Sequence, residues 1–259
     1  SLVAVRDWFQ SRRLQLNADK TELIWFGTKS NLGKVHTLDT VVTFENISIR
    51  PVPSVKYLGV QLDSELNMHR QVNSIAASCF FQLRRVRQLR NVIGPVAMQR
   101  VVSALILSKL DYCNAILIGL PVSTLAPLQR VQNAAARLVA GIGPRDSITS
   151  TLRHLHWLPV HYRILFKICM LVHGVFYKYG PVYLNELLVP VSELPGRTRL
   201  RSSESIKFDV PPVKLAVGGR SFSVAGPRTW NELPQTLRAI PDKLTFKRHL
   251  KTHFFNCAF

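Results

Sequence analysis

Apolar side chains recur at helical spacing after residue 66 and define one stripe of a long helix that ends near residue 90. The stripe consists of Val72, Ile75, Ala76, Cys79, Leu83 and Val86. A second helix, apolar on nearly all sides and therefore buried, is predicted to open at Gly94-Pro95. Two more are predicted, one from an N-cap at Ser123 to Gly141 and one from Pro159 to about Tyr179. Residues 66–180 are therefore expected to form a helical module.

The pattern differs on either side of this module. Residues 2–13 have helical spacing, whereas three later segments are rich in β-branched and aromatic residues and predict strands: "ELIWFG" (22–27), "TVVTFENISIRP" (40–51) and "VKYLGVQLD" (55–63). Gly59 lies inside the last segment and predicts a bulge or a close backbone approach. Residues 190–228 are rich in Pro, Gly, Ser and Arg and predict irregular structure with short strands at best. The tail places Phe246, Leu250 and Phe254 four apart, which predicts a short basic helix.

These elements predict an α+β fold that is mainly α and has three parts. Residues 1–65 form a small α+β part, residues 66–188 a helical module, and residues 189–259 an irregular basic region that ends in a short helix. A chain of 259 residues is long enough for about two domains at roughly 100–200 residues each.

Charge narrows the choice of partner. The chain has 34 Lys and Arg against 15 Asp and Glu, a net charge of +19, so it repels itself unless a polyanion is present. Nucleic acid is the first expectation and an anionic membrane surface the weaker one. The longest apolar stretch, residues 101–121, is interrupted by Lys109 and Asp111, so no membrane span is predicted. The cysteines show no CxxC spacing and are interpreted as buried, reduced thiols of an intracellular protein: Cys79, Cys113, Cys169 and Cys257.

The long helix after residue 66 also has a basic face. Opposite its apolar stripe lie Arg70, Phe81, Arg84, Arg85 and Gln88, and Arg87 and Arg90 extend the cluster. No acidic residue occurs between Glu65 and Asp111, whereas a helix that is merely solvated usually mixes charges of both signs. We therefore expect this face to follow a phosphate backbone, with a solvated charged face as the alternative. A second basic cluster is formed by Arg197, Arg199 and Arg201.

Two groups of residues have side chains of the kinds that bind metal ions. Five residues suggest zinc but lack a CxxC motif, and we expect them to be buried or interfacial instead: His154, His156, His161, Cys169 and His173. Asp63 and Glu65 are the only acidic pair two residues apart, a spacing that puts both on one face of a strand. Because they close a turn, we interpret them as surface acids and predict no metal site.

Several motifs resemble, in the expected order, the C-terminal part of the reverse transcriptase of LINE-type (non-LTR) retrotransposons. "LQLNADKTELIWFG" resembles motif D, and "VKYLGVQLDSELNMHRQV" resembles motif E, the primer-grip hairpin. The helical thumb and the region after it are similar to "LDYCNAILIGLP", "LQRVQNAAARLV" and "LHWLPVHYRILFKI". The C-terminal end of these elements is similar to "GRSFSVAGPRTWNELP" and "TFKRHLKTHFF".

The resemblance implies roles for four residues. Lys20 would stand near the departing pyrophosphate, where an ammonium stabilises developing negative charge and can donate a proton. The alternative is a surface lysine paired with Asp19 or Glu22, in a turn shaped by Asn17 and Asp19. Tyr57, Leu58 and Gly59 would form the primer grip, and the alternative is an ordinary core strand containing Tyr57 and Val60.

The resemblance also shows which part of the family is missing. The family's catalytic strand has an Ala-Asp-Asp sequence whose carboxylates hold two Mg²⁺ ions, and no Asp-Asp pair occurs in this chain. We therefore expect a fragment that starts after that strand, needs no cofactor of its own, and is not catalytic alone. Mg²⁺ would serve the intact parent, an RNA-directed DNA polymerase.

The resemblance implies two kinds of partner. One is RNA, DNA or an RNA–DNA hybrid, and the other is the upstream palm, fingers and endonuclease segments of the parent protein. It also implies localisation in the nucleus and in cytoplasmic ribonucleoprotein. The alternatives are a non-enzymatic nucleic-acid-binding protein and a decayed open reading frame derived from such an element.

Overall fold

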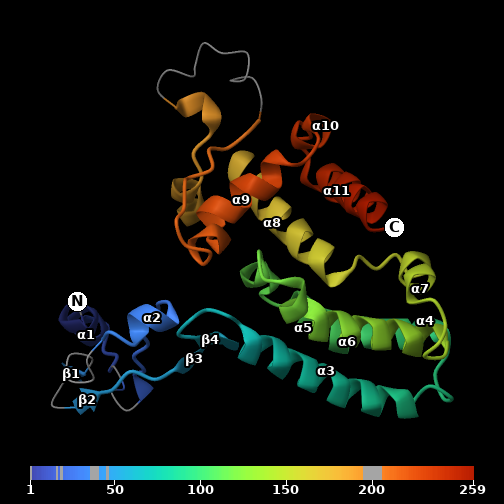
Figure 1. The fold of residues 1–259 in the computed structure, drawn as a ribbon, viewed down its shortest axis with the longest axis horizontal. Helices are drawn as coiled ribbons and strands as arrows, with labels where there is room; N and C mark the ends of the chain where they lie inside the picture. The colour runs from blue at the N-terminus through green and yellow to red at the C-terminus, as the bar shows by residue number, and fades with distance from the viewer. Residues whose placement is uncertain (1, 16, 18–19, 36–40, 45–46, 195–205) are drawn as a thin grey trace. The chain divides into compact units, whose positions relative to one another are not determined.

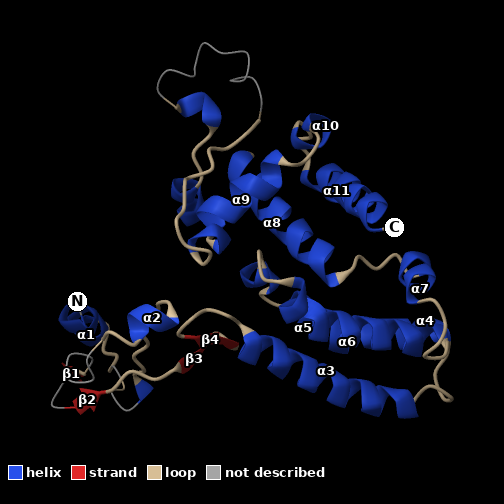
Figure 2. Cartoon of the chain, in the orientation of Figure 1, coloured by secondary structure: helices blue, strands red, loops and turns tan. Residues whose placement is uncertain are grey.

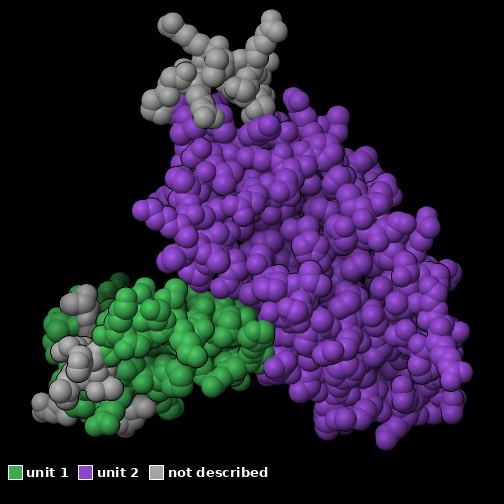
Figure 3. Space-filling view, in the orientation of Figure 1, with its two compact units in different colours: residues 1–71 green, residues 72–259 purple. Residues whose placement is uncertain are grey.

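The computed structural model describes residues 2–15, 17, 20–35, 41–44, 47–194 and 206–259. The chain divides into two compact units, residues 1–71 and residues 72–259, shown in two colours in Figure 3. Helices dominate, and the described strands form two small antiparallel sheets (Figure 2). The predicted fold class, α+β and mainly α, is confirmed.

The first unit combines short helices with two hairpins. Helices α1 (Leu2–Ser11) and α2 (Lys29–Leu32) are followed by β1 (Val42–Phe44) paired with β2 (Ile47–Ile49), and by β3 (Ser54–Tyr57) paired with β4 (Val60–Asp63). Helix α3 (His69–Gln88) begins in this unit and continues into the second.

The strand predictions for the first unit need correction. Residues 22–27 do not form a strand, and Leu23 makes only an isolated bridge to Pro51. The single strand predicted for residues 55–63 is a hairpin, because the chain turns at Leu58 (φ 46°) and Gly59 (φ 81°). Two central residues with positive φ form the tight turn that matches the twist of paired strands. Gly59 therefore belongs to a turn, as expected for a hairpin, and not to a bulge.

Helices make up most of the second unit (Figure 1). After α3 come α4 (Pro95–Val102), a π-helical segment (Ser103–Leu107), α5 (Ser108–Asp111), the 3₁₀ helix η3 (Asn114–Leu117) and α6 (Val122–Ala140). Then follow α7 (Ile148–His154), α8 (Val160–Phe176), 3₁₀ helices at Val182–Leu187, Val191–Glu193 and Gly218–Arg220, α9 (Phe222–Asn231), α10 (Gln235–Arg238) and α11 (Lys243–Ala258).

The core of the second unit lies where the periodic patterns of α3, α6 and α11 predicted it. The expectation that the helix opening at Gly94-Pro95 is buried on nearly all sides is wrong, because α4 buries only Met98 and Val102 and exposes Val96. The α3 stripe is buried except for Ile75, which is half-buried, and the apolar stripes of α6 and α11 are buried as well. Helix α8 packs against α6, α9 and α11. Gly141 (φ 73°) ends α6 as predicted, but Ser123 is not its N-cap. Pro121 occupies that position without a side-chain cap, because a proline with its fixed φ already favours a helix start.

Helix α9 was not predicted, because Gly226 and Pro227 are poor helix formers. Gly226 allows α9 to approach α8 closely, since a Cβ at this position would lie only 3.2 Å from Cγ2 of Val172. Trp230 of α9 is fully buried. Tertiary packing therefore outweighs local propensity here.

The predicted division of the chain at residues 65 and 188 stays a prediction.

The four cysteines differ in burial. Cys79 and Cys169 are buried, but Cys113 and Cys257 are exposed, so the expectation that all four thiols are buried is wrong for two of them. Within the described ranges, no helix has the length and apolar character that crossing a membrane requires.

Candidate nucleic-acid interface

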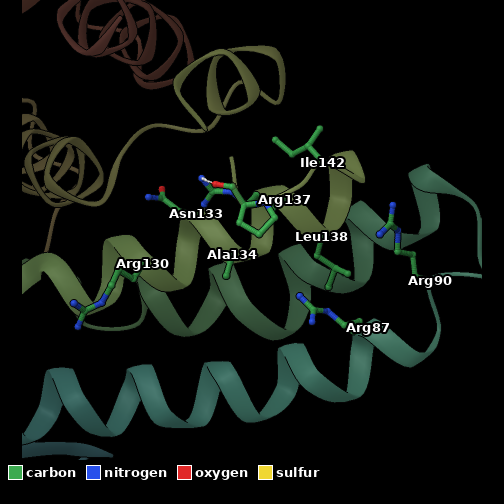
Figure 4. A pocket seen from close by; sticks show the side chains of 9 residues that line it. Arg87, Arg90, Arg130, Asn133, Ala134, Arg137, Leu138 and Ile142 are labelled. Carbon is green, nitrogen blue, oxygen red and sulfur yellow. Dashed lines mark hydrogen bonds between the residues drawn. The ribbon is translucent and has the colours of Figure 1, made fainter. Parts of the chain in front are cut away.

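Helices α3 and α6 border a groove lined by arginines. A cavity of about 590 Å³ is lined by Arg87, Arg90, Arg130, Asn133, Ala134, Arg137, Leu138, Ile142 and Pro144 (Figure 4). An adjoining cavity of about 220 Å³ is lined by Phe80, Leu83, Arg84, Arg87, Ala134 and Leu138. The two cavities share three residues, so we treat them as one feature, the arginine groove.

Helical spacing explains why these side chains converge. Arg84 and Arg87 are three apart on α3, and Arg130, Ala134 and Arg137 follow at intervals of four and three on α6. Residues at these intervals share one face of a helix. Ala134 contributes only a methyl group, so it leaves space between the arginines on either side of it.

The four arginines of the larger cavity are not equally engaged. Arg137 donates from Nε to the Gly143 carbonyl oxygen (3.3 Å) and from Nη2 to that of Pro144 (3.4 Å). The Arg90 guanidinium lies against Gly141, where a Cβ would be 2.6 Å from Nη2. Both therefore help to hold the chain where α6 ends. The exposed side chains of Arg87 and Arg130 make no hydrogen bond or ion pair within the part of the chain that the structure describes.

Among the described residues, no carboxylate lines the arginine groove. The ion pairs between described residues, Arg6–Asp7 and Arg163–Asp111, involve none of its arginines. Guanidinium groups without carboxylate partners suit phosphate oxygens, with which they form charge-assisted, often bidentate hydrogen bonds. The groove therefore has the chemistry of a phosphate-binding surface.

The structure separates the arginines that the sequence grouped on the long helix. Arg84, Arg87 and Arg90 reach the groove, whereas Arg85 lies 5.8 Å from the ring centroid of the exposed Phe81, outside the groove lining. Arg70 belongs to the first unit and donates to Oγ of Ser54 (2.9 Å). Arg197, Arg199 and Arg201 lie outside the described residues.

Arg130 and Arg137 were not predicted as site residues. Their spacing of seven on one helix was visible in the sequence. Periodicity alone, however, does not reveal that this face of α6 borders α3.

The second candidate surface is the tip of the β3–β4 hairpin, within the first unit. Tyr57 is 65% exposed and Leu58 is 73% exposed, whereas Val60 is buried. The interpretation of Tyr57 as a core residue is therefore wrong, and that of Val60 is confirmed. A large apolar side chain held outward at positive φ is a strained arrangement of the kind that clusters at functional sites.

Lys20 follows a turn made by Asn17. The Lys20 amide donates to Oδ1 of Asn17 (3.1 Å) and the Thr21 hydroxyl donates to the Asn17 carbonyl oxygen (2.9 Å), which confirms Asn17 as a turn-forming residue. The Lys20 side chain is exposed, and no ion pair to Glu22 or another described carboxylate involves it. Asp19 lies outside the described residues.

Asp63 has a structural role, and it is buried rather than a surface acid. Its carboxylate accepts hydrogen bonds from the amides of Asn67 (2.9 Å) and Met68 (2.8 Å), directly before α3. Glu65 is exposed. Within the described ranges, no cluster of three or more His, Cys, Asp or Glu residues is suited to a metal ion.

The histidines and the cysteine that suggested zinc are dispersed. Cys169 and His173 are fully buried in α8, where burial raises the pKa of the Cys169 thiol. His154, His156 and His161 are exposed. Both ring nitrogens of His173 form hydrogen bonds, one with Tyr179 and one with the Ile240 carbonyl oxygen.

The chain matches no protein-family model, no curated protein and no solved structure. The features that bear on function are therefore those of its own residues: the arginine groove, the exposed hairpin tip and the order of its sequence motifs.

Proposed function

We propose that this chain binds nucleic acid through its phosphates. The arginine groove is the contact within residues 72–259, and the hairpin tip at Tyr57, Leu58 and Gly59 is the contact within residues 1–71. The observation that carries the proposal is the convergence of five arginines on the arginine groove, with no described carboxylate in its lining. The guanidinium groups of Arg87 and Arg130 are not engaged by described residues. Such contacts bind any sequence, because phosphate is the same at every position.

The proposed ligand is the RNA–DNA hybrid of primer and template. The resemblance to LINE-type reverse transcriptases supports this choice, because it assigns the hairpin to the primer grip and the helices to the thumb. In this proposal the chain comprises three parts of an RNA-directed DNA polymerase: the last part of the palm, the thumb, and the C-terminal region. The Asp-Asp pair and its Mg²⁺ ions belong to the upstream part of that parent protein, so this chain binds without polymerising.

Replacing Arg87 and Arg130 with glutamine tests the groove. Both side chains are exposed and make no hydrogen bond or ion pair within the described ranges, so the fold should tolerate their loss. Each arginine that contacts a phosphate adds about one to the slope of log K against log salt. We expect Arg87→Gln/Arg130→Gln to weaken hybrid binding and to lower that slope by about two. Fluorescence anisotropy with a labelled RNA–DNA hybrid at several salt concentrations measures both quantities.

Arg153→Gln/Arg228→Gln is the matched control. It removes the same charge from exposed positions on α7 and α9, outside the groove. An equal loss of affinity in both double variants would contradict the groove as the contact.

Tighter binding of the hybrid than of single strands is expected for a thumb. Equal binding of all forms would instead favour a general, non-enzymatic nucleic-acid-binding protein.

A further inference from the structure

A second cavity in the second unit shares no residue with the arginine groove. It has a volume of about 280 Å³ and lies where η3, the connection before α8, α8 itself and α11 meet. The residues that define its chemistry are Asn114, Trp157, Phe166, Lys167, Lys247 and Lys251. We call this cavity the lysine pocket.

One side of the lysine pocket is cationic. Lys247 and Lys251 are one turn apart on α11, and Lys167 comes from α8. All three are exposed and form no ion pair with a described carboxylate. Asp111 also lines the pocket but is already engaged by Arg163, through Nε to Oδ1 (2.8 Å) and through a second bond from Nη2 to Oδ2. The lysines are therefore available to an anion.

Asn114, one of the residues that line the pocket, has an unsatisfied acceptor. Asn114 is only 3% exposed, and its Oδ1 is buried without a hydrogen-bond partner among the described residues. Its Nδ2 faces the Asp111 carboxylate (3.4 Å), which accepts and cannot donate, so Oδ1 occupies the other position. A buried acceptor without a partner costs about 1–3 kcal/mol, and a ligand that supplies a donor recovers that energy.

We infer that the lysine pocket binds a phosphomonoester with a hydroxyl or amino donor, that is, a single nucleotide. The phosphate meets the lysines, a donor of the sugar or base meets Oδ1 of Asn114, and Trp157 and Phe166 supply apolar wall. A cavity of about 280 Å³ is near the lower end of small-molecule sites and suits one nucleotide rather than a duplex. The same chemistry is present in a free mononucleotide and at the 5′-phosphorylated end of a strand.

Calorimetric titration of the full chain with uridine 5′-monophosphate tests the cationic side. Losing one charge-assisted hydrogen bond is expected to raise the Kd about tenfold in Lys247→Gln. The neighbouring variant Arg248→Gln removes the same charge from α11 outside the pocket and is expected to leave the Kd unchanged. Equal weakening by both variants would show that only general charge matters and would overturn the inference.

Asn114→Leu tests the acceptor. Leucine is similar in size and removes the unsatisfied oxygen, so the Tm is expected to hold. Binding of uridine monophosphate should weaken about tenfold, whereas inorganic phosphate, which meets only the lysines, should bind as before. An unchanged Kd for uridine monophosphate would mean that water or nothing occupies Oδ1 and would overturn the inference.

Two further titrations identify the source of the ligand and separate this site from the groove. A 5′-phosphorylated oligonucleotide that binds tighter than its 5′-hydroxyl form and than the mononucleotide assigns the pocket to a strand end. Tighter binding of the mononucleotide assigns it to a free nucleotide. Arg87→Gln/Arg130→Gln should keep its affinity for uridine monophosphate. Binding of uridine monophosphate to the lysine pocket and binding of the hybrid to the arginine groove are therefore tested independently, and either proposal can be contradicted without the other.

Discussion

His173 is a buried, titratable residue in the core of the second unit. It is fully buried, stacks on Phe246 (3.9 Å between ring centroids), and hydrogen-bonds the Ile240 carbonyl oxygen (2.8 Å) and the Tyr179 hydroxyl. The carbonyl fixes the ring proton on Nε2, so Nδ1 accepts from Tyr179. Burial lowers the pKa of His173 from its usual 6.5, although the bond to Ile240 and the charge of Asp242 oppose this shift.

The lowered pKa predicts a loss of stability in acid. Below pH 6.5 the unfolded chain binds a proton that the folded chain resists, so the free energy of unfolding falls as pH drops from 6.5 toward the folded pKa. The slope for one such group is at most about 1.4 kcal/mol per pH unit. His173→Gln cannot take up this proton. It should be less stable at pH 7.5 but lose less on acidification, as measured by urea unfolding at a series of pH values.

His249→Gln is the matched control for this prediction. His249 is exposed on α11, so replacing it removes a histidine from the same unit without disturbing the packing around His173. His253 also has a pKa lowered by burial, so His173→Gln should keep a smaller slope rather than none. An acid response of His173→Gln as steep as that of the native chain would contradict the role of His173.

At the scale of elements, the β3–β4 hairpin has an exposed tip whose backbone conformation is unfavourable for the residue that occupies it. Leu58 adopts φ 46°, a conformation that costs a residue with a side chain about 1–2 kcal/mol, whereas Asn tolerates it better. We predict that Leu58→Asn slows hydrogen exchange of the hairpin amides and at the same time weakens binding of the RNA–DNA hybrid. Exchange measured by mass spectrometry and affinity measured by anisotropy check the two halves.

Leu66 offers the control for the hairpin. It also has positive φ (52°), but it follows the hairpin and lies away from the tip. Leu66→Asn should relieve similar strain and leave hybrid affinity unchanged. If Leu58→Asn binds as tightly as the native chain, the tip is not a nucleic-acid contact.

Helical periodicity predicted much of the second unit. The buried positions of α3, α6 and α11 follow from repeats of three and four, which depend on neighbours along the chain alone. The hairpins and α9 were harder to predict. Leu58 is an unfavourable residue for its turn, and α9 contains Gly226 and Pro227, whose place in a helix depends on contact with α8.

The candidate sites depend on contacts between distant segments. Arg87 and Arg90 could be predicted from the basic face of one helix, but Arg130 and Arg137 join them only because α3 and α6 border the same groove. The lysine pocket likewise draws Asn114, Lys167 and Lys247 from three separate elements. Charge along the sequence indicated a polyanion as partner, whereas the binding positions required the fold.

At the scale of the whole molecule, the net charge of +19 must be separated from the sites that it surrounds. A chain with this charge repels itself, and a bound polyanion relieves the repulsion in the folded state. We predict that heparin raises the Tm at low salt and that the rise disappears near 1 M salt, where the Debye length is about 3 Å. Arg87→Gln/Arg130→Gln should keep most of the heparin-induced rise, because most of the charge remains, while its affinity for the RNA–DNA hybrid falls. A rise that is lost together with hybrid affinity would instead make the arginine groove the general anion site of the chain. A rise that persists in 1 M salt would show that heparin binds through contacts other than charge.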